Sequence, residues 1–317
     1  MCVANFSTIF TGHLREEILL VLKALGGALK DKEHLIELNL SDNTFSPTGT
    51  EPMVDFLTHT RSLQILCLNN NGLGISGGTM IAKALLANAE KACANNRSSS
   101  LRSIICSCNH LEDGSSEALA NTFATHGTLI KVCMLQNGIC PDGICHLTRG
   151  LFKNPNLHML DLQDNTFTKC GCLALTEALT SWSHLYHLNV GKCLLSNKSG
   201  VAIADALILG KNQALKDVNL SYNEIESDAI TCLTKAIAAN LPNLDALDEL
   251  DDMEDESEEE EKEEEEEEEE EEGKKDKEDR VVESVDMEAN LEPVRKANKE
   301  EEKEEKELSQ KLSDTYI

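Results

Sequence analysis

One internal repeat limits what this chain can fold into more than any other feature of its sequence. The template L-x-x-L-x-L-x-x-N-x-L recurs in seven copies, which begin at Leu35, Leu63, Leu101, Leu129, Leu157, Leu185 and Leu215. Successive copies start 28, 38, 28, 28, 28 and 30 residues apart. Self-similarity at such a period is typical of a solenoid, in which each repeat packs only against its neighbours.

Each copy predicts one β-strand followed by one α-helix. Apolar residues two positions apart, such as Leu38 and Leu40, share one face of a strand. The asparagine that follows, which is Cys193 in the sixth copy, can bond backbone groups where the strand leaves the sheet. The remaining residues show helical spacing of apolar side chains. We therefore expect an α/β leucine-rich-repeat solenoid, a ribonuclease-inhibitor-like horseshoe with strand-helix repeats of about 28 residues and a parallel inner sheet.

The array is irregular at three places. The spacing of 38 residues requires an insertion, and the polar residues 94–100 predict a loop there. Residues 4–9 look like half a repeat followed by a helix over about 14–29, and Leu244 begins an eighth copy that dissolves into acidic sequence. Since neither end looks like a cap, we expect a marginally stable or aggregation-prone chain.

The charge is concentrated at the C-terminal end. From Asp248 onward the chain has 35 acidic and 11 basic residues, including ten consecutive glutamates at 263–272, whereas the first 247 residues have 22 acidic and 18 basic ones. We expect a leucine-rich-repeat domain at 1–247 and a disordered, low-complexity acidic tail at 248–317. Such an anion disfavours nucleic acid as a partner, and the tail suits basic proteins or serves only as a solvating segment.

The sequence offers little chemistry of its own. It contains no apolar stretch of membrane-spanning length, no secretory signal, no P-loop and no H-E-x-x-H motif. Its 12 cysteines therefore indicate free thiols in a reducing compartment. The pairs Cys106/Cys108 and Cys170/Cys172 lack the spacing of a zinc site, so neither a metal nor a cofactor is expected. The nine histidines are scattered and are expected to be solvated.

Two cysteines occupy a special repeat position. Cys67 and Cys133 lie between two core positions, which would place them on the concave face as accessible thiols. Nothing near them in sequence indicates a lowered pKa, so a nucleophile is not expected. The composition predicts a binding scaffold, with the loops between strand and helix as its contact surface.

The loops carry a more specific signal. The segments LNLSDNTFSPTGTEPMVDFL, LRSIICSCNHLEDGS and LSYNEIESDA, together with the junction DELDDME, resemble the Ran GTPase-activating proteins in their fungal form. The resemblance covers essentially the whole chain and includes residues that the generic repeat does not require. Compared with that family, the chain looks shortened at both ends.

The resemblance implies a function. Proteins of this family bind the GTP form of the small GTPase Ran and accelerate its hydrolysis, and they regulate the GTPase without an active site of their own. This implies a role in nucleocytoplasmic transport and a cytoplasmic location, including the cytoplasmic face of the nuclear envelope. The catalytic step would be preorganisation of the glutamine of Ran that orients the attacking water.

Two residues fall on catalytic motifs of the family. Asn109 aligns with the asparagine of Gly-Arg-Asn-Arg, which reads Ser107-Cys108-Asn109-His110 here, and His13 aligns with the arginine of Phe-Thr-Gly-Arg. Histidine is shorter and mostly neutral at pH 7, so it cannot replace a fixed guanidinium charge. The resemblance also implies a set of partner-binding residues: Asp42, Asn43, Asn71, Gln136, Asn137, Asp164, Asn165, Tyr222 and Asn223.

Three functions remain open on the sequence alone. The chain could be an active Ran GTPase activator, a Ran-binding relative with little or no activity, or a generic leucine-rich-repeat scaffold. The asparagines among the partner-binding residues also belong to the repeat itself, so a structural role competes with direct contact for each. Asp42, Gln136 and Asp164 are not required by the repeat and are better candidates for contact.

Overall fold

The computed structural model describes residues 2–10 and 12–248, in which strands and helices alternate. The strands are β1 (Cys2–Asn5), β2 (Leu35–Asn39), β3 (Ile65–Cys67), β4 (Ser103–Ile105), β5 (Lys131–Cys133), β6 (Met159–Asp161), β7 (His187–Asn189), β8 (Asp217–Asn219) and β9 (Ala246–Asp248). The helices are α1 (Arg15–Leu29), α2 (Ser46–Gly49), α3 (Glu51–His59), α4 (Gly74–Ala94), α5 (Glu112–His126), α6 (Pro141–Leu151), α7 (Thr168–Leu179), α8 (Asn197–Ile208) and α9 (Ser227–Asn240).

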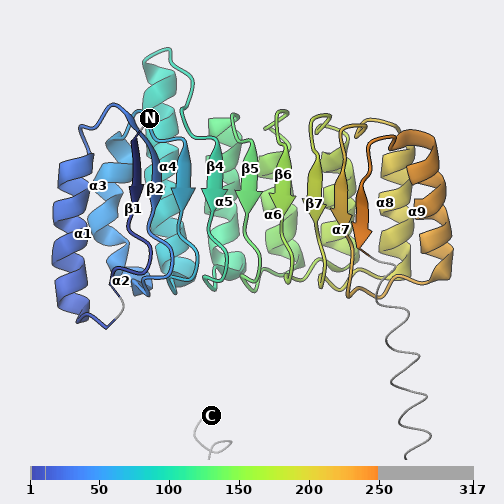
Figure 1. The fold of residues 1–317 in the computed structure, drawn as a ribbon, viewed down its shortest axis with the longest axis horizontal. Coiled ribbons are helices and arrows are strands. Elements are labelled where there is room, and N and C mark those ends of the chain that lie inside the picture. Colours follow the sequence, from blue (N-terminus) through green and yellow to red (C-terminus); the bar gives the residue numbers. More distant parts are fainter. Residues whose placement is uncertain (1, 11, 249–317) are drawn as a thin grey trace, which may run out of the picture. The chain divides into compact units, whose positions relative to one another are not determined.

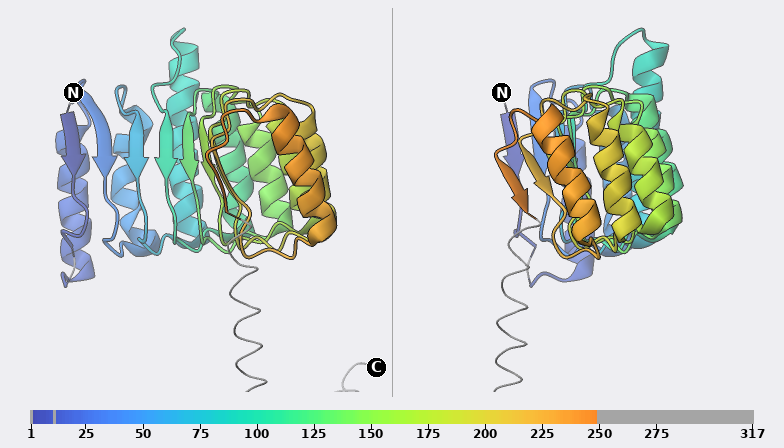
Figure 2. Two further views of the ribbon diagram at one scale, coloured as in Figure 1. Left: turned by 45° about the vertical axis from the view of Figure 1, so that its right-hand side comes forward. Right: turned by 90° about the vertical axis from the view of Figure 1, so that its right-hand side faces the viewer.

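All of these strands form one parallel sheet in the order of the chain, from β1 to β9 (Figure 1). Consecutive parallel strands need a crossover, and a helix supplies it in each repeat. The helices therefore form a second layer on one side of the sheet (Figure 2). The register keeps repeat positions aligned, since Leu38 pairs with Leu66 and Leu66 with Ile104. The expected α/β leucine-rich-repeat solenoid is confirmed.

The core is a continuous layer between the sheet and the helices. Leu160 and Leu188, which face the helices from neighbouring strands, are fully buried. Phe123 on α5 and Trp182 after α7 fill the same layer with larger side chains, and both are also fully buried. Burial of this kind supplies most of the stability of a solenoid, because each repeat covers the apolar face of the next.

The expected loop at residues 94–100 is confirmed from residue 95 onward, and Ala94 is the last residue of α4. Most of the extra residues lengthen α4, which has 21 residues and projects beyond the neighbouring helices in Figure 1. Its sequence is rich in alanine, which favours helix, so the helix continues through residue 94 before the loop begins.

Strands lie at both ends of the described array. The expected half repeat overlaps β1, whose pairing with β2 shifts register between Cys2 and Val3, and the expected eighth copy contains β9. The expected tail lies outside the described residues except for Asp248, the last residue of β9. The expected marginal stability stays a prediction. Between residues 12 and 248, none of the helices combines the length and apolar character needed to cross a membrane.

Candidate functional site

A ladder of buried asparagines forms the edge of the sheet where the strands end. We call the side chains at the N position of the template the asparagine ladder: Asn43, Asn71, Asn109, Asn137, Asn165, Cys193 and Asn223. Asn109 shows the pattern, because its Nδ2 donates to the carbonyls of Leu68 (2.8 Å), Cys106 (3.0 Å) and Ser107 (2.9 Å). Its Oδ1 accepts from the backbone N–H of Asn71 at 3.0 Å. The ladder thus ties each repeat to the next.

The residue before each ladder position points outward. These residues, which we call the edge row, are Asp42, Asn70, Cys108, Gln136, Asp164, Lys192 and Tyr222. All have φ between 50° and 61°, a left-handed conformation that side chains other than glycine adopt rarely. The backbone N–H of Asp42 donates to Asn69 O at 2.8 Å, and that of Cys108 donates to Leu135 O at 3.0 Å. These bonds help to hold the conformation and turn the side chains away from the core.

The edge row has a mixed chemical character. Asp42 Oδ1 accepts a hydrogen bond from Asn70 Nδ2 at 3.2 Å. Lys192 Nζ lies 4.6 Å from the centre of the Tyr222 ring, a cation–π contact, and 64 % of Tyr222 is exposed. Acidic, amide, basic and aromatic groups therefore follow one another along this edge of the sheet. Neighbouring groups lie about one strand spacing apart. Such a surface suits recognition of a folded protein.

Four of the predicted partner-binding residues belong to this exposed row: Asp42, Gln136, Asp164 and Tyr222. The other five are ladder positions, namely Asn43, Asn71, Asn137, Asn165 and Asn223. Their amides bond backbone groups, as Asn137 does to Cys106 O at 3.1 Å and Met134 O at 2.9 Å. Direct contact with a partner would break such bonds, so the structure gives these asparagines a structural role.

Asn70 and Lys192 were not predicted from the sequence, and Cys108 was named only as part of the motif around Asn109. They occupy the same repeat position as Asp42 and Gln136, and the signal that finds them is their place directly before the ladder residue. The repeat template is defined by buried residues, so it does not mark the exposed position beside them.

The two predicted catalytic positions lie on the same edge but apart. The side chain of Asn109 is completely buried, between the half-buried Cys108 and the exposed His110, which have φ of 57° and 54°. His13 is exposed in the loop after β1, with Nδ1 3.6 Å from Glu17 Oε2. Three strand spacings, about 14 Å, separate the loops after β1 and β4 along the edge seen in Figure 1.

The expectation that the thiols of Cys67 and Cys133 are accessible on the concave face is wrong. Cys67 and Cys133 are buried, 9 % and 6 % exposed. Burial raises the pKa of both thiols, and that of Cys133 to about 11, so they are neutral at pH 7. Burial also raises the pKa of Asp161 on the same face. Over residues 2–10 and 12–248, no three histidine, cysteine or carboxylate side chains cluster in a way that could hold a metal ion.

Comparisons with known proteins show which sequences this chain is similar to. A family model described as "Leucine Rich repeat" matches residues 32–54 and 211–233. Over 231 residues the chain is 38% identical to "Ran GTPase-activating protein 1" of Saccharomyces cerevisiae, covering 71% of this chain and 56% of that protein.

Two animal proteins match shorter stretches. "Ran GTPase-activating protein 1" of Xenopus laevis is 41% identical over 138 residues, which are 43% of this chain and 24% of that protein. "Ran GTPase-activating protein" of Drosophila melanogaster is 38% identical over 162 residues, which are 49% of this chain and 27% of that protein. The matched part of the chain thus spans just over half the length of the yeast relative and about a quarter of the animal ones.

Proposed function

Because this chain is a leucine-rich-repeat relative of the Ran GTPase-activating proteins, we propose that it stimulates hydrolysis of GTP by the small GTPase Ran. The observation that carries the proposal is the 38% identity with the yeast relative over 231 residues. The nucleotide and the attacking water belong to Ran, so the chain acts as a regulator of a GTPase. Its own part is to bind the GTP form and hold the catalytic glutamine in place.

The edge row is the surface we assign to Ran. The ladder beneath it holds its backbone in one conformation, so little backbone freedom is lost on binding. Asn109 then acts as a positioning residue, because its amide bonds hold the backbone on which Cys108 and His110 are presented. Preorganisation of this kind contributes to catalysis only if the supporting shell is rigid.

A second candidate is a Ran-binding relative with little activity. The observation that favours it is the absence of arginine at the family's motif positions, which are Cys108, His110 and His13 here. A neutral imidazole or thiol stabilises developing negative charge less than a guanidinium does. The third candidate, a generic scaffold, has no comparable observation in its favour.

The finer assignments follow from the same proposal. The protein would act in the cytoplasm, including the cytoplasmic face of the nuclear envelope. No nucleic acid is involved, because the chain carries a net charge of −28. The acidic residues from 248 onward would contact basic protein surfaces.

Single-turnover GTP hydrolysis by Ran, with and without saturating full-length chain, tests the proposal. We expect faster hydrolysis, and weaker Ran binding for Asp164→Ala on the edge row. The matched control is Asp205→Ala, which removes one exposed carboxylate from α8 and should change nothing. Ran binding without acceleration would favour the second candidate, and no binding would refute both.

The effect of replacing the family arginines by other residues can be tested separately. We expect His13→Arg to increase the hydrolysis rate, since it restores a permanent positive charge at the family position. His34→Arg adds the same charge in an exposed loop at the other edge of the sheet and serves as the control. If His13→Arg binds Ran as before and leaves the rate unchanged, the arginine argument does not apply to this chain.

A further inference from the structure

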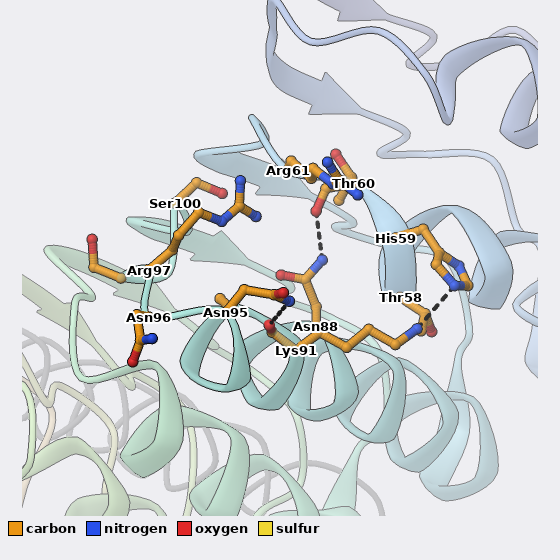
Figure 3. Close-up of a pocket in the computed structure, with 12 residues that line it drawn as sticks. Thr58, His59, Thr60, Arg61, Asn88, Lys91, Asn95, Asn96, Arg97 and Ser100 are labelled. Atoms are coloured by element: carbon orange, nitrogen blue, oxygen red, sulfur yellow. Dashed lines mark hydrogen bonds between the residues drawn. The ribbon is translucent and has the colours of Figure 1, made fainter.

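A polar pocket lies at the edge of the sheet opposite the edge row, beside the insertion. It encloses about 760 Å³ and is built from the end of α3, the last turns of α4 and the loop that follows (Figure 3). The long α4 and its loop supply most of the lining, including Asn88, Lys91, Asn95 and Arg97. The insertion that separates this repeat from the others therefore creates a feature that a standard repeat of 28 residues lacks.

The pocket is positively charged in a chain that is strongly acidic. Its lining contains Arg61, Lys91 and Arg97 and no carboxylate. Lys91 Nζ donates to His59 Nε2 at 2.9 Å. Among the described residues, neither the guanidinium of Arg61 nor that of Arg97 has a hydrogen bond or ion pair. Two of the three cations thus have their donors free for a ligand.

Helix ends explain only part of this charge. Cations stabilise the C-terminal turn of a helix, and Lys91 occupies such a position on α4. Arg61 and Arg97 lie beyond the ends of α3 and α4, in the segments that lead away from them. Stabilisation of helix ends therefore does not explain why Arg61 and Arg97 line the same pocket.

The floor of the pocket also offers an acceptor. Asn88 Nδ2 donates to Leu57 O (3.0 Å) and Thr60 O (2.6 Å), which fixes the orientation of the amide. Its Oδ1 has no hydrogen-bond partner among the described residues, and Asn88 lines the pocket (Figure 3). An acceptor in the same pocket as two guanidinium groups suits a peptide, which brings N–H donors along with its anionic group.

The surroundings favour a compact anion over an extended one. The adjoining hollow shares His59 and Arg61 with the pocket, and Lys30, Asp31, Lys32 and Glu33 complete its lining. Asp55 pairs with Lys30 at 2.7 Å and with His59 at 3.0 Å. A long polyanion, such as a run of glutamates or a nucleic acid, would extend from the pocket onto this surface of mixed charge. One concentrated dianion within the pocket would not.

We propose that this pocket binds a phosphorylated serine or threonine of a partner protein. A phosphate monoester carries a charge of about −1.5 to −2 at pH 7 and three acceptor oxygens, which match the free donors of Arg61 and Arg97. The peptide on either side would lie along the polar floor, with a backbone N–H bonded to Asn88 Oδ1. This site is separate from the edge row, so both proteins could be bound at once.

Fluorescence anisotropy of the full chain with a labelled alanine peptide carrying one central phosphoserine tests the proposal. We expect saturable binding that the double variant Arg61→Gln/Arg97→Gln weakens by about tenfold or more, since two charge-assisted contacts are lost. The matched control is Arg149→Gln/Lys153→Gln, which removes two exposed charges near the end of α6. Circular dichroism of each variant checks that the fold is kept.

Three further probes distinguish a phosphopeptide from other anionic ligands. The unphosphorylated peptide and its glutamate version should bind at least about tenfold more weakly. Equal binding of the glutamate peptide would overturn the phosphate assignment. Binding to phosphoinositide vesicles without binding to the phosphopeptide would point to a lipid and also refute it. The Arg61→Gln/Arg97→Gln variant should stimulate GTP hydrolysis by Ran as the unaltered chain does, so failure here is distinguishable from failure of the proposed function.

Discussion

Each asparagine of the ladder forms hydrogen bonds with several backbone groups at once. Its side chain thus bonds backbone groups that a neighbouring strand would otherwise bond. The sixth repeat departs from this arrangement. Cys193 Sγ lies 3.5 Å from Leu162 O and 3.3 Å from Gly191 O, where an asparagine amide would donate. A thiol is a weak donor, so the ladder is interrupted between Asn165 and Asn223.

We predict that Cys193→Asn stabilises the protein by about 1 kcal/mol, because neutral hydrogen bonds to buried carbonyls replace weak thiol contacts. Urea unfolding followed by circular dichroism would measure the change. Cys93→Asn, an exposed substitution at the end of α4, is the control and should be neutral. A loss of stability for Cys193→Asn would mean that the buried site cannot accommodate the larger side chain.

Sequence reasoning identified the ladder more easily than the surface beside it. Asn109 and Asn137 recur because their buried geometry tolerates few alternatives, so a template finds them. Cys108 and Lys192 vary in type because solvent accepts any side chain there, and only the backbone shows that they share one conformation. The same reasoning failed for Arg61 and Arg97, since 36 residues separate them in the chain and the fold alone brings them to one pocket.

At the scale of elements, α4, α5 and the loop between them are joined by one histidine. His126, the last residue of α5, bonds Ser99 Oγ through Nδ1 at 2.5 Å and Leu85 O through Nε2 at 3.1 Å. It is 5 % exposed, contrary to the expectation that the histidines are solvated. Burial lowers its pKa to about 4. The neutral ring thus holds the insertion loop against α5.

This burial predicts a loss of stability in mild acid. The unfolded chain binds a proton at His126 near pH 6.5, whereas the folded chain binds it only near pH 4. The contribution of the neutral ring is therefore complete above pH 6.5 and is lost as the pH falls toward 4. Between pH 7 and pH 5 we expect a loss of about 2 kcal/mol.

The variant His126→Gln isolates this effect from the titration of carboxylates. It should lose about 2 kcal/mol less than the wild type over the same interval, measured by urea unfolding at each pH. Parallel losses in the two proteins would show that His126 does not couple folding to protonation.

Two helices also carry thiols close enough to be joined. Cys145 Sγ on α6 lies 3.1 Å from Cys170 Sγ on α7, and Cys170 is exposed. Burial and the contact with Cys170 raise the pKa of Cys145 to about 11, so Cys170 should react first with an oxidant. Diamide accepts two electrons and two protons from the pair as the disulfide forms.

We predict that diamide links Cys145 to Cys170 before other thiols of the described residues. Peptide mapping by mass spectrometry without reduction would show the cross-linked fragments. The Cys170→Ser variant should lose them and keep its fold. Preferential cross-linking of another pair in the folded protein would contradict the geometry.

The length of α4 shows why elements were harder to predict than the architecture. The repeat period required a strand and a helix in every unit, and the parallel sheet followed from stacking them. An insertion has no period, and the polar residues 94–100 predicted its loop but not the longer helix that precedes it. Local helix propensity determined the length of α4, and the repeat period does not predict that length.

At the scale of the whole molecule, charge separates the body from the acidic C-terminal residues. The first 247 residues are nearly balanced, with 22 acidic and 18 basic side chains, so binding at the edge row should depend little on salt. The residues from 249 onward lie outside the described structure, and their effect on Ran must be sought in solution. They would raise the association rate of a basic surface by long-range attraction.

We predict that ending the chain at Asp248 weakens Ran binding mainly at low salt. The full chain should bind more tightly than the truncated one at an ionic strength of about 0.01 M, where charges act over about 30 Å, and the two should converge near 1 M, where the range is about 3 Å. Surface plasmon resonance at both ionic strengths would measure the affinities, with circular dichroism of the truncated chain as the folding control. If the two chains bind equally at low salt, the acidic segment does not attract Ran and serves to keep the protein in solution.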